Sequence, residues 1–155
     1  MINNIYNLLE PQSTASITLE GGLGNQLFKI FSLISYSIDS NKKYIFNRNL
    51  PKISNKNLDI RHTYWDNLFK SISKNTYDTK KHFENKYQEK KFYEYSEIPF
   101  YEKDTLLIGY YQNYRYFEKN YNQIINILNL NEIQNSIKTK YLNNQNTISL
   151  HFRRG

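Results

Sequence analysis

The sequence contains no cysteine, which excludes both a disulfide framework and a thiolate metal site. Its three histidines, His62, His82 and His151, are scattered among carboxylates that do not cluster, so we expect no structural zinc. Long apolar runs are missing too, and no stretch approaches the roughly 20 apolar residues that a membrane-spanning helix needs. Met1 to Glu10 has neither a basic start nor an apolar centre, which argues against a signal peptide. We expect a soluble protein, either cytoplasmic or peripheral to a membrane.

What the sequence does contain is typical of one globular domain. Its 155 residues include 39% hydrophobic and 16% aromatic residues, enough to bury a core. The formal net charge of +7 suits an anionic partner, such as a sugar nucleotide, a nucleic acid or a membrane surface. Most of that charge is lysine spread along the middle of the chain, so a solvated basic surface is the favoured explanation. A basic module that binds RNA or an anionic glycan through the Lys70 to Lys91 run is the alternative function, although no RNA-binding motif is present.

The N-terminal half predicts a strand, a glycine-rich turn and a helix. Residues 16–20 alternate polar and apolar side chains, as a strand does, and the turn Gly21 to Asn25 follows. From Gln26 onward the apolar spacing becomes helical, and Asn25 is a suitable helix cap. Residues 43–47 predict a second strand, parallel to the first. The predicted inward residues of the helix are Leu27, Ile30, Phe31, Ile34 and Ile38.

The remaining residues predict further alternation of strands and helices. Residues 48 to about 100 read as loops around one or two short helices, whereas 105–109 and 147–152 read as strands. A helical stripe runs from Phe117 to Leu128, and a capping box at Asn131 and Gln134 predicts another helix with Ile133, Ile137 and Tyr141 facing inward. We therefore predict an α/β fold with a Rossmann-like, mostly parallel sheet and flanking helices. The domain spans 1–155, with 1–15 as an N-terminal extension.

Two segments at the carboxyl ends of predicted strands are candidate ligand sites, because ligands of open α/β sheets bind at that edge. In the first, Gly22, Leu23, Gly24 and Asn25, glycines let backbone amides approach an oxygen ligand, and the helix start favours negative charge. This segment matches neither the dinucleotide fingerprint, which needs glycine where Leu27 stands, nor a phosphate-binding P-loop. A tight turn without a ligand explains it equally well.

The second candidate segment is His151 to Gly155. Strand alternation puts His151 and Arg153 on one side and Arg154 on the other, so Arg153 could grip a diphosphate with His151 beside it. Arg154 would then anchor the loop or a neighbouring carboxylate. A basic segment that binds nothing in particular is the alternative.

Taken in order, three segments resemble the signatures of the α-1,2-fucosyltransferase family. Residues 21–28 read Gly-Gly-Leu-Gly-Asn-Gln-Leu-Phe, and residues 109–117 resemble the family's aromatic Gly-Tyr-Phe-Gln segment. Residues 149–155 match its His-X-Arg-Arg-Gly-Asp motif up to Gly155. The resemblance spans Gly21 to Gly155, but residues 48–98 add almost nothing to it.

The resemblance implies the N-terminal domain of a two-domain, B-type glycosyltransferase. It implies transfer of fucose from GDP-fucose, without a metal ion or other cofactor, to a glycan acceptor, typically O2 of galactose, with inversion. Arg153 and Asn25 become the catalytic candidates. The donor-binding candidates are Gly22, Leu23, Gly24, Asn25, His151, Arg153 and Arg154.

The family's aspartate after Gly155 and its second, nucleotide-binding domain have no counterpart in this sequence. We therefore expect weak donor binding and a chain that is inactive alone. A separately encoded C-terminal half is a further expected partner, and no nucleic acid is expected under this interpretation.

Overall fold

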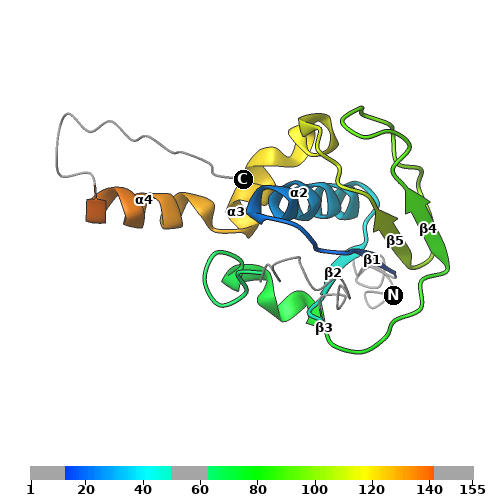
Figure 1. Ribbon diagram of the computed structural model, residues 1–155, viewed down its shortest axis with the longest axis horizontal. Coiled ribbons are helices and arrows are strands. Elements are labelled where there is room, and N and C mark those ends of the chain that lie inside the picture. Colours follow the sequence, from blue (N-terminus) through cyan, green and yellow to red (C-terminus); the bar gives the residue numbers. More distant parts are fainter. Residues whose placement is uncertain (1–12, 50–62, 142–155) are drawn as a thin grey trace, which may run out of the picture.

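The computed structural model describes residues 13–49 and 63–141, and these form a parallel sheet with helices packed beside it (Figure 1). The strands are β1 (Thr14–Ile17), β2 (Lys43–Asn47), β3 (Thr76–Tyr77), β4 (Asn85–Gln88) and β5 (Thr105–Ile108). The α-helices are α2 (Leu23–Asp39), α3 (Tyr121–Ile127) and α4 (Leu130–Tyr141). Three short 3-10 helices complete the set: η1 (Lys70–Asn75), η2 (Tyr114–Tyr116) and η3 (Glu118–Asn120).

The five strands lie in the order β3-β2-β1-β5-β4, and every neighbouring pair is parallel. The chain first builds outward from β1 to β2 and β3, then continues on the other side with β4 and β5. The strand order therefore reverses between β1 and β5. Such a reversal opens a crevice at the carboxyl edge of the sheet, where α/β proteins bind ligands. The predicted α/β, Rossmann-like fold is confirmed.

The core lies between the sheet and α2. Ile17 of β1 pairs with Phe46 of β2 and Leu107 of β5, so the three buried side chains form one row across the sheet. On α2, Ile30 and Ile34 are fully buried against this core, as their helical spacing predicts. Phe31 is buried too, whereas Leu27 and Ile38 are partly buried against the core.

The predicted boundaries near the first turn need correction. Strand β1 begins at Thr14 and ends at Ile17, two residues before the predicted range at its start and three at its end. Helix α2 begins at Leu23 with Gly22 as its cap, because the amide of Gln26 donates to the carbonyl of Gly22 at 3.1 Å. The prediction that Asn25 caps the helix is therefore wrong, and Asn25 lies inside the first helical turn.

The described part of residues 48–100 holds two strands that the sequence did not predict. Strands β3 and β4 are short and polar, with no apolar run to mark them, and they form because they pair with β2 and β5. The 3-10 helix η1 is the short helix that was expected there. Just before it, Trp65 packs its ring against Phe46 and Phe69 and is only 7% exposed, which makes it a core residue.

The strand predicted at 105–109 is β5, which is followed by 3-10 turns and then by α3. Ile124 and Leu128 are fully buried, as predicted. The next helix, α4, begins at Leu130, so Asn131 lies within it instead of capping it. Ile137 is 54% exposed, and its predicted inward position is wrong because α4 packs mainly against α3. The strand predicted at 147–152 lies outside the described residues.

Within 13–49 and 63–141, no helix combines the length and the apolar character that crossing a membrane requires.

Candidate functional site

The glycine turn after β1 is shaped by Gly21. Its φ of +80° is a backbone conformation that side chains disfavour, and a Cβ at this position would lie 2.6 Å from Nδ2 of Asn25. Gly24 differs, because it lies in the first turn of α2 with nothing within 4 Å of an added Cβ. The local packing therefore requires glycine at position 21 but leaves the space above Gly24 open.

The side chain of Asn25 faces a segment that is distant in the sequence. Its Oδ1 accepts a hydrogen bond of 2.6 Å from Nε2 of Gln112, which lies 87 residues further along the chain. Gln112 belongs to the segment that follows β5, so this bond joins the turn after β1 to the turn after β5. Two of the three segments that carry the family resemblance are thus joined by a direct contact.

Gln26, the residue after Asn25, is fully buried, and its side chain holds the turn by a hydrogen bond. Its Nε2 donates to the carbonyl of Gly21 at 3.0 Å, while its Oε1 has no partner among the described residues. The first amides of α2 have no acceptor within the helix and carry its positive dipole end. Leu23, 37% exposed, and the exposed Gly24 present this helix start to solvent.

A second turn follows β5 and is held by Glu89, a residue that comes directly after β4. The carboxylate of Glu89 accepts the backbone N–H of Tyr110 at 2.8 Å and that of Tyr111 at 3.1 Å. A Cβ on Gly109, whose φ is +147°, would lie 2.5 Å from Cβ of Glu89. Glycine here lets the carboxylate come close enough to bind both amides. Tyr111 itself is fully buried, whereas Tyr114 is 60% exposed.

Lys29 lies between the two turns and is only 1% exposed. Its Nζ donates to the carbonyl of Thr18 at 3.1 Å and to Oε1 of Glu20 at 3.0 Å. It also lies 4.5 Å from the centre of the Tyr110 ring. Burial lowers the pKa of Lys29, while Glu20 opposes that shift through its hydrogen bond and charge. Because Lys29 neutralises Glu20, this carboxylate does not repel an anion at the helix start.

Sequence reasoning did not single out Glu20, Lys29 or Glu89, and it noted Gln112 only as part of the segment 109–117. Helical spacing places Lys29 among the inward residues of α2, and a lysine there is the one signal that could have indicated a buried ion pair. The roles of Glu89 and Gln112 depend on contacts between segments that lie far apart in the sequence, and local sequence patterns do not predict such contacts.

Of the predicted site residues, the structure brings Gly22, Leu23, Gly24 and Asn25 together at the carboxyl edge of the sheet. His151, Arg153 and Arg154 lie outside the described residues, so their meeting with the glycine turn stays a prediction. No group of three or more potential metal ligands occurs in the part of the chain that the structure describes.

Comparisons of the chain with models of protein families, with curated proteins and with solved structures found no match. The functional interpretation therefore depends on the residues and their geometry.

Proposed function

We propose that this chain is a fucosyltransferase domain that binds GDP-fucose at the carboxyl edge of its sheet, between the turns that follow β1 and β5. Fucose passes to a sugar hydroxyl, O2 of a galactoside, with inversion. The observation that carries the proposal is the hydrogen bond between Asn25 and Gln112, because it joins two of the three signature segments at the edge where α/β sheets bind ligands.

Gly24 provides independent support. Glycine in a helix costs about 1 kcal/mol relative to alanine, and nothing in the described structure occupies the space that an alanine methyl would take. A glycine that local packing does not require is explained if a ligand approaches the backbone there. A diphosphate fits, because the free amides at the start of α2 favour negative charge.

In the proposed reaction, the acceptor hydroxyl oxygen attacks C1 of fucose from the face opposite the leaving group. The bond between C1 and the β-phosphate oxygen breaks, GDP leaves with the bonding electron pair, and the hydroxyl proton passes to solvent or a base. Arg153 stabilises the charge that develops on the leaving phosphate, with His151 and Arg154 supporting it. Asn25, oriented by Gln112, contacts the reacting sugar from the other wall.

The test is a titration of the chain with GDP-fucose in which the binding affinity is measured by calorimetry. Arg153→Ala removes a charge-assisted contact and is expected to weaken binding at least about tenfold. Gly24→Ala is expected to weaken binding similarly while raising the free energy of unfolding by about 0.5–1 kcal/mol. Arg115→Ala serves as the matched arginine control, since Arg115 is exposed and its guanidinium lies over the Tyr95 ring.

The proposed donor site is refuted if the parent chain, Arg153→Ala and Gly24→Ala bind GDP-fucose with equal affinity. A Gly24→Ala variant that loses both stability and binding would show that the glycine is structural, and would remove that line of support.

A further inference from the structure

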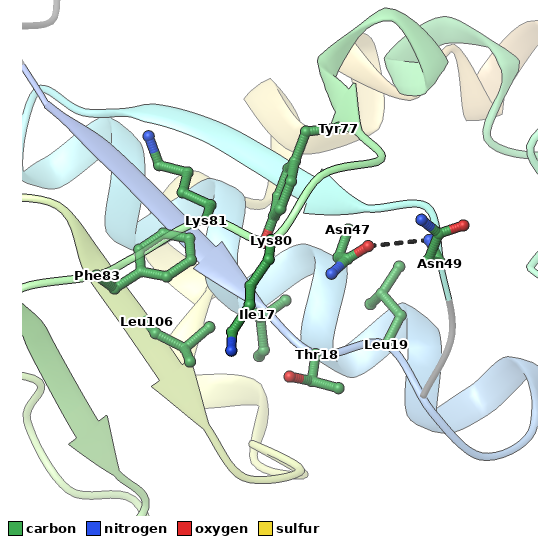
Figure 2. Close-up of a pocket in the computed structure, with 10 residues that line it drawn as sticks. All are labelled: Ile17, Thr18, Leu19, Asn47, Asn49, Tyr77, Lys80, Lys81, Phe83 and Leu106. Atoms are coloured by element: carbon green, nitrogen blue, oxygen red, sulfur yellow. Dashed lines mark hydrogen bonds between the residues drawn. The ribbon is translucent and has the colours of Figure 1, made fainter. Parts of the chain in front are cut away.

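A pocket of about 260 Å³ lies at the carboxyl ends of β1 and β2 and is separate from the two turns described above (Figure 2). The segment that leads from β3 towards β4 forms its other wall. Its volume is just below the roughly 300–1,000 Å³ of pockets for drug-sized ligands, so it matches a single sugar ring. Its lining residues are Ile17, Thr18, Leu19, Asn47, Asn49, Tyr77, Lys80, Lys81, Phe83 and Leu106.

Two asparagines at the end of β2 supply neutral hydrogen-bonding groups. Oδ1 of Asn47 accepts from the amide of Asn49 at 2.9 Å, and Nδ2 of Asn49 donates to the carbonyl of Asp78 at 2.6 Å. These bonds fix both side chains. They leave Nδ2 of Asn47 as a donor and Oδ1 of Asn49 as an acceptor with no partner among the described residues. A sugar hydroxyl uses one group of each kind.

The charged lining residues are both cations, and no aspartate or glutamate lines the pocket. Lys81 is already paired, since its Nζ lies 2.8 Å from Oδ2 of Asp104. Lys80 has no ion pair or hydrogen bond with any residue in the described ranges. Lys80 is exposed, and Figure 2 shows its side chain drawn across the mouth of the pocket. The pocket therefore contains one positive charge that the described chain leaves uncompensated.

The remaining wall is aromatic. The rings of Tyr77 and Phe83 lie 6.4 Å apart, and Phe83 is 5% exposed. The hydroxyl of Tyr77 lies 3.3 Å from Oγ of Ser16, which fixes the ring against the sheet. Apolar ring faces beside a few fixed polar groups are typical of small-molecule sites.

We propose that this pocket binds a sugar unit that carries one anionic group, with the anion on Lys80, the hydroxyls on Asn47 and Asn49, and the ring against Tyr77. The binding itself does not depend on the donor assignment. Under the proposed function, this bound sugar is the acceptor of the fucose transfer, and that second assignment rests on the proposed function. Uronic acids and phosphosugars share this chemistry, and the experiment separates them.

The experiment titrates the chain with galacturonate, galactose 6-phosphate and neutral galactose, and follows backbone amide shifts by NMR. One or both of the anionic sugars are expected to bind at least about tenfold more tightly than galactose, with shifts at Asn47, Asn49 and Lys80. The stronger of the two identifies the anion. In Lys80→Gln this advantage is expected to fall to about twofold or less, while Lys74→Gln, which changes an exposed lysine outside the pocket, keeps it.

The proposal is overturned if galactose binds as tightly as both anionic sugars, if none of the three binds, or if Lys80→Gln keeps the full advantage. GDP-fucose is titrated in parallel, and Lys80→Gln is expected to leave its affinity unchanged. If the parent chain binds GDP-fucose but neither anionic sugar, the pocket proposal is refuted and the donor site stands. If the parent chain binds an anionic sugar but not GDP-fucose, the proposed donor site is refuted and the pocket stands.

Discussion

Removal of the Glu89 carboxylate tests whether it holds the turn after β5. In the Glu89→Ala variant, the backbone N–H groups of Tyr110 and Tyr111 lose their acceptor, to which they donate at 2.8 and 3.1 Å. The backbone bond from the amide of Glu89 to the carbonyl of Ile108 at 2.8 Å is unaffected, so strand pairing persists. The substitution therefore acts mainly on the turn, although it also removes a negative charge that raises the pKa of Lys29.

The expected loss follows from burial. Glu89 is 9% exposed, and each buried donor left without a partner costs about 1–3 kcal/mol. Two donors give about 2–6 kcal/mol, and water that enters the vacated space recovers part of it. We therefore expect the free energy of unfolding to fall by about 2–4 kcal/mol, a large share of the stability of a domain of this size.

The assay is urea unfolding followed by the fluorescence of Trp65, the only tryptophan and a buried one. Glu94→Ala is the control, because Glu94 is exposed and, among the described residues, its carboxylate pairs with the exposed Lys91. That pair is expected to contribute little, because both side chains are exposed and water screens their attraction. The reasoning is refuted if Glu89→Ala unfolds within 0.5 kcal/mol of the parent chain, or if the control loses as much.

The buried ion pair and the buried tyrosines give two further predictions. Glu20→Gln is expected to cost more than about 1 kcal/mol, because it removes the carboxylate that pairs with the buried ammonium of Lys29 and leaves only the more distant charge of Glu89. Lys29→Met is expected to be close to neutral, because Glu20 has 40% of its side chain exposed and can be hydrated. Equal losses in urea unfolding would contradict this. Burial raises the pKa of five tyrosines, so above pH 10 the unfolded state releases protons that the folded state retains, and the free energy of unfolding falls by up to about 1.4 kcal/mol per pH unit for each. Burial lowers the pKa of Lys29 and Lys42, which acts in the opposite sense below pH 10.5, but these are two groups against five. A urea midpoint that stays constant from pH 9 to pH 11 would count against this sign. The five are Tyr36, Tyr44, Tyr87, Tyr111 and Tyr116.

The fold could be predicted where local pattern and tertiary packing agree. Strand β2 was predicted at its observed bounds because its apolar residues lie in a short run between polar loops. Strands β3 and β4 could not be predicted, since a sequence such as Asn-Lys-Tyr-Gln has no strand pattern and extends only because β5 pairs with it. Tertiary pairing overrides weak local preference in such cases.

The candidate site, too, could be predicted from the sequence only in part. The glycine turn could be predicted because Gly21 and its neighbours lie where the alternation of a strand ends and the apolar spacing of a helix begins. The role of Asn25 was predicted incorrectly as a helix cap, because asparagine is a good cap wherever a helix begins nearby. Its partner Gln112 lies on another segment, and local pattern does not predict a contact over 87 residues.

The position of β5 between β1 and β4 affects the order in which the domain assembles. β1 pairs with β2, and helix α2 connects these two strands along the chain. The other edge of β1 pairs with β5, for example Ala15 with Thr105, so it stays unpaired until β5 has been synthesised. At about 5–20 residues per second during synthesis, roughly 5–18 seconds separate the two strands. We expect the β1-α2-β2 unit to form first with one strand edge exposed. The contact between Asn25 and Gln112 then forms only when that edge closes, so the candidate site is among the last features of the domain to assemble.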